Sequence, residues 1–167
     1  METQAQTDVQ TSPTIAKDFE TRLGKTDHAA LRLWLRLLTC TQIIEKRVRN
    51  HLRTDFATTL PRFDLMAQIA KVPNGMRMSE LSARMMVTGG NITMIVDQLG
   101  SENLVERIAV EGDKRATKIA LTPLGHRQFA LMAHDHEGWI IDAFEGLNTK
   151  ESAQLHALLA KVKSNLK

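Results

Sequence analysis

The sequence predicts a mainly helical protein with a small β-hairpin wing: a winged helix-turn-helix placed between N- and C-terminal dimerisation helices. Two short helical patterns with a tight connection occupy residues 78–99, and two alternating strand patterns follow at 104–121. Long amphipathic patterns lie on either side of this region. The order of these elements is more specific than any one of them. With 167 residues and 43% hydrophobic side chains, the chain is long enough for one compact core.

The composition argues against a membrane span and an internal disulfide. No apolar run approaches the roughly 18 residues of a spanning helix. Cys40 is the only cysteine, so a reducing, cytoplasmic setting fits. Residues 1–27 are polar, lack the apolar centre of a secretory signal, and are expected to form a loose tail. The net charge of +3 permits an anionic partner without requiring one.

The first helix pattern, over residues 28–53, lies in the most basic part of the chain. Seven basic and two acidic residues occur between positions 31 and 62. On charge alone, this segment is either a solvated helix face or a surface for a nucleic acid or an anionic ligand. Apolar residues crowd most of the helix circumference, so the helix needs cover on more than one side. A second helix is expected from Pro61, with Thr59 as its cap, and "PNG" stops it.

The two short helices come next. Ser79 lies near the start of the first, in "MRMSELSARMMV". The second is "TGGNITMIVDQL", in which Thr88 is a suitable cap and the glycines beside it permit close backbone approach. Its apolar residues fall at i, i+3, i+4 and i+7, which is one face of a helix: Ile92, Ile95, Val96 and Leu99. The segment contains no Lys or Arg.

Strands and further helices complete the chain. "LVERIAV" and "TKIAL" alternate like strands, and "EGDKRA" between them has the Gly and Asp of a turn. Thr122 and Pro123 suit the cap and first turn of a long helix that ends near Phe144. Asn148 and Glu151 have the spacing of a capping box at the start of the last helix. Both helices carry apolar stripes.

These patterns divide the chain into a tail (residues 1–27), a dimerisation helix (28–60), a winged helix-turn-helix (61–122) and dimerisation helices (123–167). The small central module cannot cover the apolar faces of the terminal helices alone. Packing against the same helices of a second chain is the economical solution, which gives a two-fold homodimer. Two recognition helices about one helical turn apart would then match a palindromic DNA site.

Four stretches resemble the MarR family of bacterial regulators: "MRMSELSARMMV", "TGGNITMIVDQL", "NLVER" and "DKRATKIALTPLG". The last matches the family's wing signature at Asp113, Arg115, Leu121, Thr122, Pro123 and Gly125. The resemblance extends from about Asp27 to the C-terminus. It implies a homodimeric winged-helix transcription regulator, usually a repressor that a small ligand releases from its operator. It also makes Arg115 the wing-tip arginine that reaches the minor groove, and Asp113 the acid that supports the wing.

The chain departs from the family pattern at three positions. Many relatives have basic residues near positions 94 and 98, where this chain has Met94 and Gln98. These changes affect base preference more than fold. Relatives also commonly have Gly where Asn103 stands; because Asn tolerates a left-handed helix end, the turn should survive.

Base reading needs donors, acceptors or methyl contacts, and affinity needs phosphate contacts. Asn91 suits adenine, Thr93 a thymine methyl group, and Gln98 a base or a phosphate. The full set of expected DNA contacts is Arg77, Ser79, Arg84, Thr88, Gly89, Gly90, Asn91, Thr93, Gln98, Lys114, Arg115 and Lys118. Unpaired on this surface, Asp97 would repel phosphate, so we expect a basic partner for it, with Arg115 or Lys118 as candidates.

Family members bind effectors where the first, second and fifth helices meet near the dimer interface. The corresponding residues here are Trp34, Phe63, Met66, His136, Trp139 and Ile140, which suit a flat apolar ligand. "LRLWLRLL", "LPRFDLMAQI" and "HEGWI" resemble the subgroup that senses aromatic acids or hydroxycinnamoyl-CoA thioesters. Arg32 and Arg36 would then receive a carboxylate or the CoA phosphates. Alternatively, each residue is simply core, and the arginines extend over the dimer surface.

Other functions remain as alternatives. The sequence contains no nucleophile elbow, phosphate loop or paired metal motif, so an enzyme is not expected. His134 and His136 point to different sides of a helix and cannot easily share a metal ion, although a metal or an oxidant could replace the phenolic effector. Cys40 lies in an apolar helix, where a buried, inert thiol is expected. An architectural DNA-binding protein without an effector is the third alternative.

Overall fold

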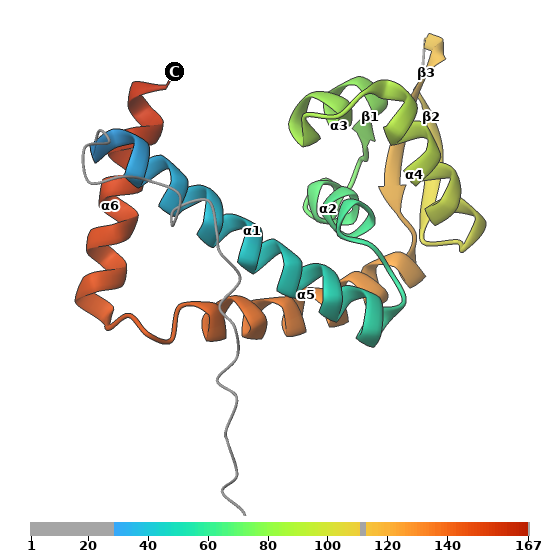
Figure 1. Cartoon of the computed structure of the whole chain (residues 1–167). Coiled ribbons are helices and arrows are strands. Elements are labelled where there is room, and N and C mark those ends of the chain that lie inside the picture. Colours follow the sequence, from blue (N-terminus) through green and yellow to red (C-terminus); the bar gives the residue numbers. More distant parts are fainter. Residues whose placement is uncertain (1–28, 111–112, 167) are drawn as a thin grey trace, which may run out of the picture. The chain divides into compact units, whose positions relative to one another are not determined.

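The computed structural model describes residues 29–110 and 113–166, with the backbone alone at 113–116. In chain order, its elements are α1 (Ala29–Phe56), α2 (Leu60–Ile69), β1 (Met76–Arg77), α3 (Met78–Met85), α4 (Gly89–Ser101), β2 (Val105–Val110), β3 (Asp113–Leu121), α5 (Pro123–Ala143) and α6 (Thr149–Asn165) (Figure 1). The chain forms two units, which are described separately; one ends at Ile43 and the other begins at Ile44, within α1. The element order confirms the predicted winged helix-turn-helix.

The wing is part of a three-stranded antiparallel sheet in which β3 lies between β1 and β2. β2 and β3 pair from Val105 opposite Leu121 onward, and the two-residue β1 places Met76 opposite Ile119. Gly75 permits the turn before β1, because its φ is 68° and a Cβ there would lie 2.8 Å from the Ile119 carbonyl oxygen. The sequence predicts only the hairpin, since two residues are too few to show alternation.

The core of the larger unit lies where α2, α3, α4 and the sheet meet. Leu81 of α3 and Ile119 of β3 are completely buried. The predicted apolar stripe of α4 is confirmed, because its members are at most 6% exposed: Ile92, Ile95, Val96 and Leu99. Burying one such side chain stabilises the fold by about 1.5–3 kcal/mol. This stripe therefore determines which face of α4 points outward.

Two of the predicted helix caps form as expected. The Thr122 hydroxyl accepts a hydrogen bond from the Gly125 N–H at 2.9 Å. Asn148 and Glu151 form a reciprocal capping box, with N–H to side-chain oxygen distances of 2.9 and 3.0 Å. Thr59 occupies the N-cap position of α2, but its side chain accepts no cap hydrogen bond, so the expectation of a side-chain cap there is wrong. Local spacing thus predicts where these helices begin.

The end of α4 is a left-handed turn at Asn103, whose φ is 57°. The Asn103 N–H donates to the Gly100 carbonyl and the Leu104 N–H to the Leu99 carbonyl, both at 2.9 Å. The turn survives without glycine, as predicted, because Asn tolerates positive φ. The Thr122 hydroxyl also donates to the Asn103 carbonyl at 2.7 Å, which ties this turn to the start of α5.

Apolar surface remains exposed on the terminal helices. α6 has no buried residue, and its Leu158 and Leu166 are 55% and 82% exposed. In the unit that ends at Ile43, Leu33 is 56% exposed. Cys40 is exposed as well, which corrects the expectation of a buried thiol: a step of about 100° along the helix turns it away from buried Thr39. Within the described residues, no helix is both long and apolar enough to cross a membrane.

Candidate nucleic-acid interface

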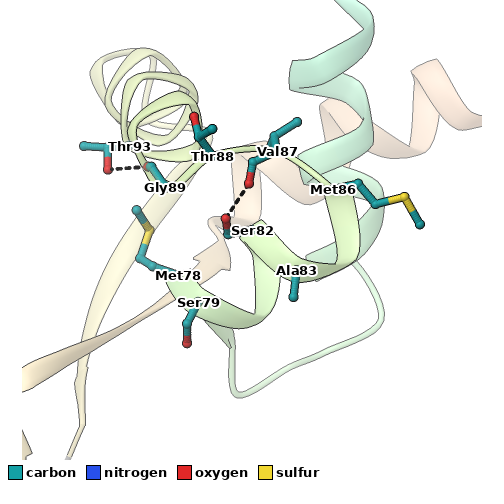
Figure 2. Close-up of a pocket in the computed structure, with 9 residues that line it drawn as sticks. All are labelled: Met78, Ser79, Ser82, Ala83, Met86, Val87, Thr88, Gly89 and Thr93. Carbon is teal, nitrogen blue, oxygen red and sulfur yellow. Dashed lines mark hydrogen bonds between the residues drawn. The ribbon is translucent and has the colours of Figure 1, made fainter.

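A compact turn joins α3 to α4. Met86 has a left-handed backbone, with a φ of 54°. The N–H of the next residue, Val87, donates a hydrogen bond of 3.2 Å to the Ser82 carbonyl. The Ser82 hydroxyl donates back to the Val87 carbonyl at 2.6 Å (Figure 2). Ser82 therefore closes the turn twice, with its backbone carbonyl and with its hydroxyl. This closure holds the N-terminus of α4 in a defined direction, as a helix that enters a DNA groove requires.

The N-terminus of α4 presents backbone N–H groups. Thr88 occupies the predicted N-cap position, but its side chain accepts no cap hydrogen bond, which corrects that part of the expectation. Helix geometry leaves the first N–H groups, at Gly89, Gly90 and Asn91, without partners inside the helix. A Cβ at either glycine would meet nothing within 4 Å, so the space in front of them is open. Such a helix end attracts anions, including phosphate.

The outward face of α4 carries three of the predicted base-reading residues. Asn91, Thr93 and Gln98 are all exposed, opposite the buried stripe. The Thr93 hydroxyl donates to the Gly89 carbonyl at 3.1 Å (Figure 2). Met94, 55% exposed, lies on the same face. The outward face of α4 therefore carries both polar and apolar side chains, and α4 contains no Lys or Arg.

Asp97, the acid on α4, has a basic partner, as expected, but the partner is Arg107. The Arg107 guanidinium donates to the Asp97 carboxylate at 2.5 Å and links α4 to β2. The predicted candidates, Arg115 and Lys118, lie on β3. Both partners are half or more exposed, so the ion pair contributes little to stability. Its effect is on charge, because it neutralises the acid on the face that would approach DNA.

Cations lie around α4 rather than on it. Arg84 is exposed in the last turn of α3. Arg77 stands opposite Lys118 in the β1–β3 pairing, which places two cations on neighbouring strands. The structure thus brings Arg77 and Lys118 together, which the sequence does not show. The wing-tip side chains predicted to contact DNA or to support the wing, those of Asp113, Lys114 and Arg115, lie outside the described residues.

A groove of about 800 Å³ opens between α3 and the start of α4 (Figure 2). It is lined by Met78, Ser79, Ser82, Ala83, Met86, Val87, Thr88, Gly89 and Thr93. None of these side chains is charged. Four predicted DNA contacts therefore line the same groove: Ser79, Thr88, Gly89 and Thr93.

The predicted effector residues on α2 and α5 are in contact. The rings of Phe63 and His136 lie 4.9 Å apart, and those of His136 and Trp139 lie 6.2 Å apart in an edge-on arrangement. His51 of α1 stacks on Trp139 at 4.7 Å. Phe63 is 6% and Met66 is 1% exposed, while Ile140 packs partly buried against the core. Met66 also lines a pocket of about 270 Å³ on the side of Arg62 and Met132.

The other residues predicted for the effector belong to α1. Arg32 and Arg36 are exposed in the unit that ends at Ile43, as is Trp34, with 55% exposure. In the other unit, burial raises the pKa of Asp64, and the nearby His136 opposes this rise. A half-buried carboxyl beside a histidine ring is a polar feature that the sequence prediction missed.

The partners in two ion pairs of α4 and its C-terminal turn could not be identified from the sequence. One joins Asp97 to Arg107, ten residues apart, and the other joins Arg62 of α2 to Glu102 after α4. Neither pair has the i, i+4 spacing that reveals partners on one helix. As for a metal site, no group of three or more His, Cys, Asp or Glu side chains that could hold an ion occurs among the residues the structure describes.

Comparisons with known proteins agree with this geometry. Residues 58–116 match the model of the MarR family. The HTH-type transcriptional regulator YsmB of Bacillus subtilis is 27% identical over 125 residues, which cover 75% of this chain and 84% of that protein. PecS of Dickeya dadantii, also an HTH-type transcriptional regulator, is 22% identical over 131 residues, with 77% and 79% covered.

Solved structures give the same result for the fold. The crystal structure of Sco3205, a MarR family transcriptional regulator from Streptomyces coelicolor, in complex with DNA, has a TM-score of 0.74 to this chain. It is 21% identical, and the match covers 87% of this chain and 93% of that one. The fold and the site thus define a winged helix-turn-helix protein. Residues 58–116 match the MarR family model, and the fold of the chain is that of solved MarR family regulators.

Proposed function

We propose that this chain is a MarR-family transcription regulator that binds double-stranded DNA through α3, α4 and the wing. The observation that carries the proposal is the outward face of α4: exposed amides at Asn91 and Gln98, an open N-terminus at Gly89 and Gly90, and surrounding cations such as Arg84. Amides read base edges, and the helix end and cations bind phosphate. The related fold of Sco3205, solved in complex with DNA, supports this assignment.

The same proposal includes a homodimer and a palindromic operator. The exposed apolar side chains of α6, such as Leu158, Leu159 and Val162, support a second copy as their cover. Light scattering of the purified chain should give twice the monomer mass of 18.7 kDa. A monomeric mass at all concentrations would contradict the dimer.

DNA binding is tested with a duplex selected from a random-sequence library, followed by fluorescence anisotropy. Gly90→Glu places a negative charge at the open end of α4, where the absence of neighbours within 4 Å leaves the fold unaffected. A charge within about 5 Å of a phosphate opposes binding by roughly 1–3 kcal/mol. Gly146→Glu is the matched control, since Gly146 is equally open and lies in the loop before α6.

We expect Gly90→Glu to weaken binding at least about fivefold and Gly146→Glu to leave it unchanged. Affinity should also fall steeply with salt, because cations on the protein release counterions from the duplex. A library that yields no bound duplex, or equal affinities for both variants, would contradict the proposal.

For the effector, we propose an aromatic acid or its CoA thioester, of the p-coumaroyl-CoA type, that relieves repression. Ring contacts among Phe63, His136 and Trp139 support an aromatic ligand, which could replace one ring partner. Arg32 and Arg36, four residues apart on α1, suit a carboxylate or phosphates. Another small phenolic, a metal or an oxidant is the alternative.

Titration calorimetry with p-coumaroyl-CoA and with free p-coumarate distinguishes these effectors. Heat from the thioester alone indicates that the CoA group is bound, and heat from both indicates recognition of the aromatic acid. No heat from either compound would overturn this part of the proposal. DNA binding that no ligand alters would favour an architectural protein instead.

A further inference from the structure

The reading face of α4 lacks the usual means of recognising guanine. Arginine or lysine supplies the commonest contact with guanine, to O6 and N7, and α4 contains neither. Asn91, Met94 and Gln98 lie at i, i+3 and i+7 and therefore form one row along the exposed face. The centre of this row is the thioether side chain of Met94, which is 55% exposed although it is apolar. Such a thioether side chain can contribute to base recognition through apolar contacts.

A second apolar group lies beside Met94 on the same face. The hydroxyl of Thr93 is engaged within the helix, since it donates to the Gly89 carbonyl at 3.1 Å (Figure 2). The hydroxyl is thus directed back along α4, and the methyl group is the part of Thr93 left for contact outside the helix. Because Thr93 is exposed, this methyl group is accessible.

The one charge on this face is compensated. Asp97 would attract the amino group of cytosine if it were free, but it accepts a hydrogen bond from Arg107 at 2.5 Å. The contacts that remain for base discrimination are two side-chain amides and two apolar groups. Among the four bases, only thymine presents a methyl group in the major groove.

We propose that Met94, together with the Thr93 methyl group, reads thymine methyl groups, so that the preferred sites of this protein contain thymine under the centre of each α4 helix. The proposal rests on DNA binding through α4 and adds the chemical class of base that is selected. Burial of one methyl group is worth about 0.8 kcal/mol, or about fourfold in affinity.

The test replaces thymine by uracil, which removes the methyl group and keeps every hydrogen-bonding atom. A duplex selected from a random library is synthesised with single thymine-to-deoxyuridine changes, and its affinity is measured by anisotropy. We expect about fourfold weaker binding at one or more thymines in each half-site. Met94→Ala should lose this sensitivity at one of them, and Met94→Leu should retain it.

Two further variants make the test specific. Thr93→Ser keeps the hydroxyl and removes only the methyl group, so it should lose the sensitivity at a thymine next to that read by Met94. Met86→Ala is the matched control: Met86 is 93% exposed and points outward at the end of α3, away from Thr93 (Figure 2). Whatever its absolute affinity for DNA, this variant should keep the wild type's ratio of thymine-duplex to uracil-duplex affinity.

Three results would overturn the proposal. One is a selected site without thymine, and another is a duplex whose uracil forms all bind as tightly as the thymine form. The third is full uracil sensitivity in both Met94→Ala and Thr93→Ser. In each case the protein still binds a selected duplex, so DNA binding stands and only the base assignment fails. If no duplex is selected at all, the function and this inference fail together.

Discussion

Replacement of Gly125 by alanine should destabilise the junction between the sheet and α5. A Cβ at Gly125 would lie 1.9 Å from the Leu104 carbonyl oxygen and 2.9 Å from its carbonyl carbon, whereas real Cβ atoms essentially never approach closer than 3.0 Å. Both opposing atoms belong to the backbone, so no side chain can rotate away. Leu104, which immediately precedes β2, and the first turn of α5 must therefore move apart by about 1 Å.

The cost follows from the contacts that this separation breaks. The Leu104 carbonyl accepts a hydrogen bond from the Thr122 N–H at 3.1 Å, and loss of such a bond costs about 1 kcal/mol. The cap from Thr122 to the Gly125 N–H contributes about 1 kcal/mol more. Overpacking adds about 1–3 kcal/mol. We expect Gly125→Ala to lower the free energy of unfolding by about 3–5 kcal/mol in total.

Urea denaturation followed by circular dichroism measures this change, at one fixed protein concentration because a dimer's stability depends on it. Gly138→Ala is the control on the same helix, since a Cβ there would meet nothing within 4 Å. It should raise the free energy of unfolding by about 0.5–1 kcal/mol, the helix preference of Ala over Gly. A Gly125→Ala protein within about 1 kcal/mol of the wild type would refute the reasoning.

Two further predictions concern a cap and a carboxyl group. Asn148→Ala should cost about 1 kcal/mol of unfolding free energy, because it removes half of the capping box that begins α6; an unchanged urea midpoint would contradict this. Burial raises the pKa of Asp64, so the folded state binds its proton more tightly than the unfolded state does. The stabilisation is therefore complete below the ordinary pKa of 3.8 and disappears as the pH rises through the raised value. Asp64→Asn should consequently stabilise the protein at neutral pH relative to the wild type, and a melting series in which its advantage does not shrink below pH 3.8 would contradict the sign.

Local patterns in the sequence were enough to predict the fold. The spacing of Ile92 and Leu99 gave the buried face of α4, and Thr122 and Asn148 marked the starts of α5 and α6, because these signals act within a few residues. The short strand β1 was missed, since its pairing with β3 is a tertiary contact.

Parts of the geometry of the candidate site follow from the sequence, and other parts depend on tertiary contacts. The exposed positions of Asn91, Thr93 and Gln98 follow from helix periodicity once the buried stripe is known. The partner of Asp97 does not, because Arg107 reaches it across two elements. The outward position of Cys40 has a different cause, because it follows from its rotation of about 100° around α1 from buried Thr39.

Hydrogen exchange with and without a selected duplex tests DNA binding through α4 most directly. The backbone N–H groups of Gly89, Gly90 and Asn91 begin α4 without helical partners, so they exchange quickly in the free protein. If they receive phosphate oxygens, peptides covering residues 88–101 should become protected when the duplex is added. Protection confined to α6, with α4 unchanged, would contradict DNA binding through this helix.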